Sequence, residues 1–117
     1  MKNINIDFLK KCYSDDNELI IQLLSIFNDM SNEFMCLTED GIKNSNYEEI
    51  EIQSHKFGSS CQMLGLTILY EQIKFCELTS ISKSNMTLIE KEFDEIKTSL
   101  LTVKKEIDII VNTLNVV

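Results

Sequence analysis

Residues 48–77 have the sequence EEIEIQSHKFGSSCQMLGLTILYEQIKFCE, which contains His55, the only histidine of the chain. Apolar side chains in its first half recur with the three- and four-residue steps of an α-helix, at Ile50, Phe57, Cys61 and Leu64. Gly58 therefore falls inside a predicted helix, where a glycine costs roughly 1 kcal/mol relative to alanine. The stretch predicts a helix that carries a histidine close to a glycine that helix formation by itself does not favour.

Small residues lie beside this histidine on the predicted helix. Gly58 and Ser59 follow His55 by three and four residues, so they share its helical face and leave the imidazole uncovered. His55 also comes directly after Ser54 of the apolar stripe, which predicts a half-exposed side chain flanking the buried face. A lone histidine on a helix is more often a surface residue or a hydrogen-bonded core residue than a reactive one. The uncovered face favours a histidine that a partner protein can reach.

The rest of the chain predicts an all-α protein. Proline is absent and only three glycines occur, so the usual punctuation of strands and tight turns is missing. A second helix is expected after the capping pair Asp15 and Glu18, ending just before Gly41 as a left-handed cap. Its apolar stripe contains Ile20, Leu23, Phe27, Met30, Phe34 and Leu37. A short first helix is expected over residues 5–13, with either Ile6, Leu9 and Tyr13 or Phe8 and Cys12 turned inward.

The helix that carries the histidine has predicted ends. The pair Ser45 and Glu48 resembles a capping box that opens it, and it is expected to run to about Met63. Gly65 breaks it. Apolar spacing continues from Leu66 into a fourth helix, and the short connection forces this helix to pack antiparallel against the third.

The last part of the chain predicts one long helix. Residues 79–85 are rich in serine and read as a loop, and the pair Thr87 and Glu90 suggests the next cap. Residues 115–117 are expected to fray. The stripe of the long helix contains Ile89, Phe93, Ile96, Leu100, Val103, Ile107, Ile110 and Leu114. We therefore predict an antiparallel four-helix bundle with a short extra N-terminal helix, formed by residues 1–117 as a single domain.

Composition restricts the partners and the compartment. A net charge of −8 argues against binding to nucleic acid or to an anionic membrane surface. Residues 1–12 contain neither a signal-peptide core nor a cleavage site, and no apolar run approaches membrane length. The four cysteines form no CxxC pair and, with one histidine, make no convincing zinc set. We expect a cytoplasmic protein with free thiols, in which Cys61 and Cys76 are buried.

No catalytic apparatus accompanies His55 in the sequence. The chain has no glycine-rich phosphate loop, no acidic cluster arranged for Mg²⁺ and no nucleotide motif. A neutral imidazole nevertheless has one ring nitrogen free to attack phosphorus. Helical spacing places six side chains around the ring, with little charge close to it: Glu51, Ile52, Lys56, Gly58, Ser59 and Gln62.

The residues from His55 to Gly65 resemble the histidine-containing phosphotransfer (HPt) domains of two-component phosphorelays. The family pattern is a histidine, any residue, an apolar residue, lysine, glycine, a run of small residues, and then an apolar residue followed by glycine. The matching positions here are His55, Phe57, Ser59, Ser60, Leu64 and Gly65, with Leu69 and Glu77 further on. Gly58 stands at the lysine position, Ser59 at the glycine position, and Lys56 lies beside the histidine instead. Since that lysine is thought to stabilise phosphate on the histidine, its absence predicts a phosphoryl group that is short-lived or is strongly biased towards return to the receiver domain.

The resemblance implies that His55 is a phosphoacceptor that relays a phosphoryl group between receiver-domain aspartates. Receiver domains of response regulators or hybrid sensor histidine kinases would bring the aspartyl phosphate, a metal ion and a lysine. The chain would then be a monomeric phosphocarrier and not an enzyme, with no cofactor or metal of its own. Glu77 would reach across from the fourth helix to orient the imidazole, the alternative being a solvated surface charge. The six residues around the ring would form the docking surface.

Two other classes of protein are compatible with parts of the sequence. The long stripe of residues 86–114 suits a non-catalytic helical interaction module, such as an adaptor or a coiled coil, although this leaves Gly58 unexplained. A histidine kinase dimerisation segment is disfavoured, because such segments have an acidic residue after the histidine and a proline nearby. Here Lys56 follows the histidine, and no ATP-binding region is recognisable.

Overall fold

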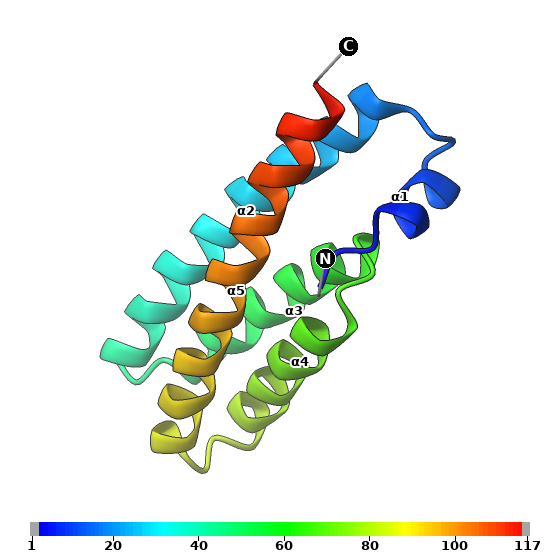
Figure 1. Ribbon diagram of the computed structural model, residues 1–117. Helices are drawn as coiled ribbons and strands as arrows, with labels where there is room; N and C mark the ends of the chain where they lie inside the picture. The colour runs from blue at the N-terminus through cyan, green and yellow to red at the C-terminus, as the bar shows by residue number, and fades with distance from the viewer. Residues whose placement is uncertain (1–2, 116–117) are drawn as a thin grey trace.

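The computed structural model describes residues 3–115, and this part of the chain contains helices and no strands. The helices are α1 (Ile6–Cys12), α2 (Asn17–Lys43), α3 (Tyr47–Met63), α4 (Thr67–Ser82) and α5 (Met86–Leu114). In Figure 1 each long helix runs back along the one before it, and α2 and α5 extend beyond α3 and α4. α3 packs on α2 and α4, and α5 packs on the same two helices, so the four long helices surround one core. The prediction of an all-helical protein is confirmed.

Aromatic side chains anchor the histidine helix in this core. The Phe57 ring stacks on Phe34 with 4.8 Å between ring centroids, and it lies 5.2 Å from the Phe27 ring. Phe34 in turn meets Phe93 of α5 edge-on, at 6.1 Å. Rings at such separations add to the free energy gained from burial. Phe57 therefore holds α3 against α2 two residues beyond His55.

The predicted apolar stripes are confirmed on α3 and α5 and partly corrected on α2. On α5 the stripe is buried from Ile89 through Ile110, and Leu114 is partly buried. The predicted Leu23, Met30 and Leu37 of α2 are only half-buried. The buried positions of this helix are Ile20, Leu24, Phe27, Ser31, Phe34, Thr38 and Gly41. Ser31 and Thr38 are buried although they are polar, so counting apolar residues does not detect them.

Asparagine and aspartate side chains start four of the helices, and this corrects the predicted caps. Asn5, Asp16, Asn46 and Asn85 each accept a hydrogen bond from the backbone N–H three residues ahead. Such bonds satisfy N–H groups that the first turn of a helix leaves free. The predicted caps Asp15, Ser45 and Thr87 were therefore wrong by one or two residues. Asp15 and Ser45 instead adopt left-handed backbone angles in the turns before the caps.

Gly41 lies inside α2, so its predicted role as the cap that ends this helix is wrong. The helix continues to Lys43, and Gly41 is buried against α3. A Cβ atom at Gly41 would lie 2.9 Å from Ile50 Cγ1, which is closer than van der Waals contact allows. The glycine therefore lets α2 and α3 approach each other. The prediction that Gly65 ends α3 is confirmed, since it follows the last turn with a φ of +68°.

The two helical glycines are expected to respond oppositely to alanine. Gly41→Ala should lower the free energy of unfolding by about 1 kcal/mol, because overpacking against the buried Ile50 outweighs the gain in helix propensity. Gly58→Ala should raise it by roughly 0.5–1 kcal/mol, because the new Cβ would make ordinary contact, 3.6 Å from the Tyr70 ring. Urea unfolding of both variants measures the change in the free energy of unfolding. Changes of the same sign in the two variants would contradict the proposed difference in packing.

α4 extends through most of the segment that was predicted to be a loop. The helix ends at Ser82, and only residues 83–85 connect it to α5. Hydroxyl groups explain the error: Thr79 donates to the Phe75 carbonyl and the buried Ser80 donates to the Cys76 carbonyl. Serine and threonine inside a helix can satisfy their hydroxyls on the preceding turn in this way. A serine-rich segment is therefore not by itself a loop.

α1 covers the end of the molecule where α3 turns into α4 (Figure 1). Two alternative sets of α1 side chains were predicted to face the core. The structure confirms the set in which Leu9 is buried and Ile6 and Tyr13 pack against the core. The Tyr13 hydroxyl donates to the carbonyl oxygen of Met63 at the end of α3, at 2.6 Å. At the other end of the chain Asn115 caps α5, and the predicted fraying of residues 116–117 falls outside the described residues.

A buried carboxylate ties the segment before α1 to α5. Glu106 accepts hydrogen bonds from the Ile4 N–H, the Asn3 side chain and the Asn3 N–H, at 2.6–3.0 Å. Burial alone would raise the pKa of Glu106, but these three hydrogen bonds outweigh it and hold the pKa below its ordinary value. The charged carboxylate is the form that binds the segment.

The hydrogen bonds accepted by the Glu106 carboxylate predict a pH dependence of stability. Because the folded pKa is lowered, the contribution is complete above the unfolded pKa of about 4.3 and is lost as pH falls through the folded pKa. Glu106→Gln should therefore be less stable than the wild type at neutral pH, and the difference should shrink under acid conditions. Urea unfolding at several pH values measures it. A difference that stays constant from neutral to acid pH would contradict a role for the charge.

Candidate functional site

His55 lies on the outer side of α3, with its side chain 73% exposed. The neighbouring residues Ser54 and Phe57 are buried, so the histidine flanks the buried face as predicted. Its exposure is greater than the predicted half, because the small residues one turn further along α3 do not cover the ring. A partner molecule can reach the imidazole from solvent.

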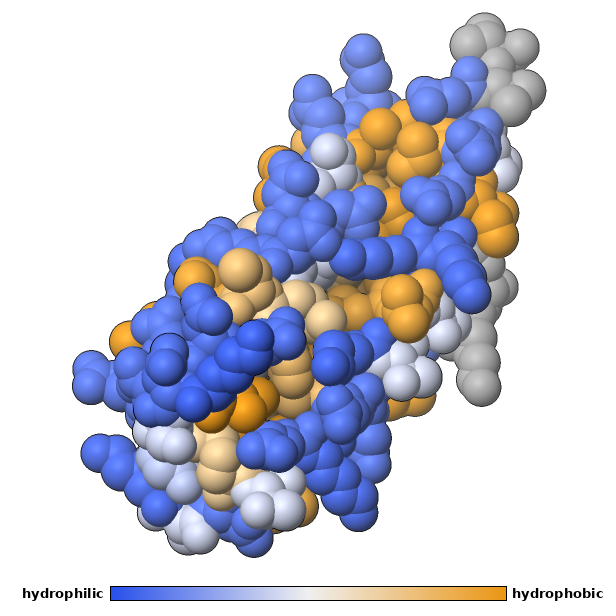
Figure 2. Space-filling view, turned by 90° about the vertical axis from the view of Figure 1, so that its left-hand side faces the viewer, coloured by the Kyte–Doolittle hydropathy of each residue, from blue (hydrophilic) through white to orange (hydrophobic). Residues whose placement is uncertain are grey.

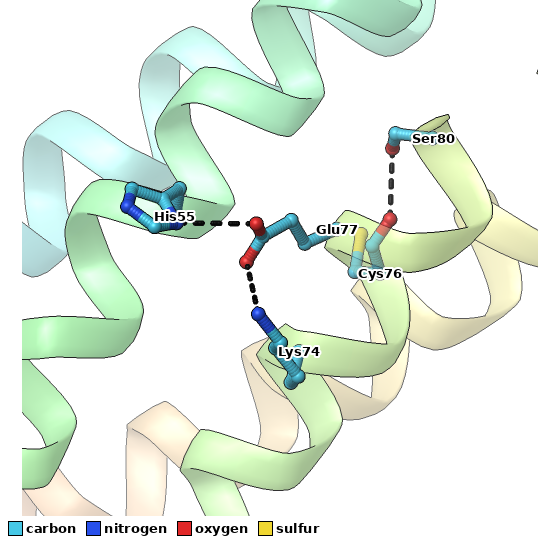
Figure 3. A network of polar contacts seen from close by, with 5 residues as sticks. All are labelled: His55, Lys74, Cys76, Glu77 and Ser80. Carbon is cyan, nitrogen blue, oxygen red and sulfur yellow. Dashed lines mark hydrogen bonds and ion pairs between the residues drawn. The ribbon is translucent and has the colours of Figure 1, made fainter. Parts of the chain in front are cut away.

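Glu77 of α4 reaches across to the imidazole, as was predicted. Its Oε2 atom lies 3.1 Å from Nδ1 of His55 (Figure 3). The Glu77 side chain is only 11% exposed, so the alternative of a solvated surface charge is wrong. A carboxylate can only accept a hydrogen bond, so this contact favours the tautomer in which Nδ1 carries the proton and Nε2 keeps its lone pair. Nε2 faces away from Glu77 in Figure 3.

Lys74 is the site residue that the sequence reasoning missed. Its Nζ atom lies 3.5 Å from Oε1 of Glu77, one turn earlier on α4 (Figure 3). Two charged groups of α4 therefore lie beside the ring, of which the sequence predicted only Glu77. The signal that could have found Lys74 is its spacing of three residues from Glu77, which places both side chains on one helical face.

Gly58 is buried, which corrects the idea that it simply opens the imidazole face to a partner. It faces the ring of Tyr70 and the side chain of Ile73 on α4. A cavity of about 70 Å³ remains between the two helices, lined by Ser54, His55, Gly58, Ser59, Gln62, Tyr70, Lys74 and Glu77. Gly58 thus has a reason in helix packing, and its part in docking stays a prediction.

The other predicted docking residues lie around His55 in different surroundings. Ser59 and Gln62 are exposed and line the same cavity as the ring. Ile52 is an exposed apolar side chain one turn before His55, and Glu51 is half-buried. Lys56 is exposed and pairs with Glu33 of α2 at 3.3 Å. The structure therefore gathers His55, Gly58, Ser59, Gln62 and Glu77 at one cavity and leaves Glu51, Ile52 and Lys56 outside its lining.

Buried thiols play a packing role, as predicted. Burial raises the pKa of Cys61 to about 12 and that of Cys76 to about 11, so both remain uncharged thiols at neutral pH. Cys12 and Cys36 are exposed. Within residues 3–115 no group of histidine, cysteine, aspartate and glutamate side chains is arranged to hold a metal ion.

A larger cavity lies elsewhere in the molecule and includes none of the residues around His55. It has a volume of about 500 Å³ and lies between the end of α2 and the start of α5, where Ile42, Met86 and Phe93 line it with charged side chains of both signs. By size alone, this cavity would be chosen as the candidate functional site. The chemistry favours the smaller one, because there a nucleophilic side chain, a buried carboxylate and a cation meet.

The surface over α2 combines charged and apolar areas. Figure 2 shows hydrophilic residues over most of this face and hydrophobic residues gathered towards its upper end, where the first half of α2 and the end of α5 lie. Leu19 and Ile26 are exposed apolar side chains of that half. None of the helices described between residues 3 and 115 is both long enough and apolar enough to cross a membrane.

Comparisons with protein-family models, with curated proteins and with solved structures found no match for this chain.

Proposed function

We propose that this protein is a histidine phosphotransfer protein, in which His55 receives a phosphoryl group from a receiver-domain aspartate and returns it. One observation carries the proposal: an exposed imidazole whose Nδ1 is held by a buried carboxylate, which leaves Nε2 free towards solvent. Folding of the chain does not require an exposed histidine to contact a buried carboxylate. A fixed tautomer is, however, what a nucleophilic ring nitrogen requires.

The proposed transfer exchanges one bond for another. The Nε2 lone pair attacks the phosphorus of the aspartyl phosphate, and the bond from phosphorus to the aspartate oxygen breaks. The aspartate carboxylate leaves with the electron pair, and a phosphoramidate forms on His55. The ring keeps its Nδ1 proton and gains positive charge, which the Glu77 carboxylate at 3.1 Å stabilises. The receiver domain contributes the metal ion and the lysine that polarise the phosphoryl group.

We also propose a detailed architecture, a class of partner and a compartment for this protein. The five helices fit an antiparallel four-helix bundle with α1 as an extra short helix, in a single domain of residues 1–117. The partners are receiver domains, which dock on the accessible residues Glu51, Ile52, Lys56, Ser59 and Gln62, while the buried Gly58 keeps the helix surface beside them low. We expect a cytoplasmic monomer. Lys56 already pairs with Glu33, so it adds little to replace the lysine missing at position 58, and the short lifetime of the phosphoryl group stays a prediction.

Phosphoryl transfer from receiver domains tests the proposal. A panel of receiver domains, phosphorylated by acetyl phosphate and Mg²⁺, is incubated with the protein, and the bound phosphate is followed. We expect label on the protein that is lost in acid and kept in alkali, as a phosphoramidate requires. If none of the receiver domains in the panel labels the wild type, the proposal is wrong.

A helical interaction module is the second candidate, and the exposed apolar side chains Leu19 and Ile26 on the first half of α2 favour it. Its other support is weakened, because the stripe of α5 is buried inside this molecule and is not left for a coiled-coil partner. Sedimentation of the protein alone separates the two candidates. Concentration-dependent self-association without labelling would favour the interaction module.

A further inference from the structure

The carboxylate of Glu77 is held at both oxygens. Oε2 contacts Nδ1 of His55 at 3.1 Å, and Oε1 lies 3.5 Å from Nζ of Lys74 (Figure 3). A carboxylate with a partner on each oxygen cannot rotate about its last side-chain bond without losing both contacts. The orientation of Glu77, and with it the contact to the imidazole, therefore depends on Lys74.

Burial increases the importance of this second contact. A buried carboxylate is stable only with partners, and a neutral imidazole supplies one N–H and no charge. Among the residues from 3 to 115, Lys74 is the only lysine within ion-pair distance of Glu77. Lys56, the other lysine near His55, is on α3 and pairs with Glu33 of α2. Lys74 is thus the cation that allows a charged Glu77 to remain behind the ring.

We propose that Lys74 is a positioning residue: by holding Oε1 of Glu77, it keeps Oε2 on Nδ1 and so keeps Nε2 as the unprotonated nitrogen of His55. The importance of this for phosphoryl transfer rests on the proposed function. Lys74 also offsets the negative charge of Glu77, which would otherwise repel a phosphoryl group on the adjacent ring. The cation comes from α4, whereas position 58 of α3 carries a glycine.

The tautomer of His55 tests this proposal directly. As the only histidine of the chain, it yields one pair of ring ¹⁵N signals, which report whether Nδ1 or Nε2 carries the proton at alkaline pH. We expect the Nδ1–H form to dominate in the wild type. Lys74→Met should lower the ratio of Nδ1–H to Nε2–H several-fold, and Lys74→Arg should restore it. Lys56→Met is the matched control and should leave the ratio unchanged.

The outcomes separate this proposal from the proposed function. Lys74 is half-exposed, so its variants are expected to fold, and circular dichroism checks this. An unchanged tautomer ratio in Lys74→Met would overturn the positioning role, whether or not the wild type accepts phosphate. A wild type that no receiver domain labels would overturn the proposed function, while the tautomer ratio still decides the role of Lys74. If both hold, the labelling rate should fall in Lys74→Met and recover in Lys74→Arg.

Discussion

Replacing His55 with glutamine should abolish acid-labile labelling of the protein and leave its fold unchanged. The amide has no nucleophilic ring nitrogen, so no phosphoramidate can form. It can still donate a hydrogen bond towards Glu77, so the buried carboxylate keeps a partner. Because the side chain is 73% exposed, the free energy of unfolding should change by no more than about 0.5 kcal/mol. Labelling with phosphorylated receiver domains and urea unfolding measure the two quantities.

A matched exposed position serves as the control for this variant. Gln22 is an exposed side chain of α2 outside the proposed docking surface, so Gln22→Ala should leave the labelling unchanged. Label that persists in His55→Gln would show that the phosphate is carried by another residue. Complete loss of label together with unfolding would show that the histidine is structural. Neither result is expected from its position outside the core.

Phe57→Ala should have the largest effect on stability, a loss of about 3–5 kcal/mol. The ring is buried between Phe27 and Phe34, where its removal leaves a cavity that close-packed neighbours cannot fill. Total stability of a domain is about 5–15 kcal/mol, so a substantial part of it would be lost. Urea unfolding measures the change, and Phe75→Ala is the control because that ring is 44% exposed on α4.

Phe57→Ala also separates folding from chemistry at the site. The substitution lies two residues from His55 but touches none of its polar contacts. Labelling should therefore decrease only in proportion to the unfolded fraction, and the folded molecules should still accept phosphate. A variant that remains folded but is no longer labelled would mean that the Phe57 packing controls the placement of the imidazole.

The helices could be predicted from the sequence because their signals are local. Apolar residues at three- and four-residue steps predicted α3 and α5 nearly to their ends, and the absence of proline excluded interruptions. Boundaries were less accurate, since neighbouring residues such as Asp15 and Asp16 compete for one cap and only backbone geometry decides between them. The exposed His55 and its contact with Glu77 were also predicted from the sequence, the contact through resemblance to a family.

Other features were decided by the tertiary structure alone. Gly41 resembles a helix end in the sequence, but it lies within α2, where α3 approaches so closely that even a Cβ atom would be crowded. Gly58 packs under Tyr70, and the Lys74–Glu77 pair of α4 lies beside the imidazole of α3. Each depends on the distance and rotation between two helices, which arise from the packing of the whole core. The sequence by itself determined that the chain forms amphipathic helices and that its single histidine flanks the buried face, because both follow from local spacing, whereas helix packing determined which groups surround that histidine.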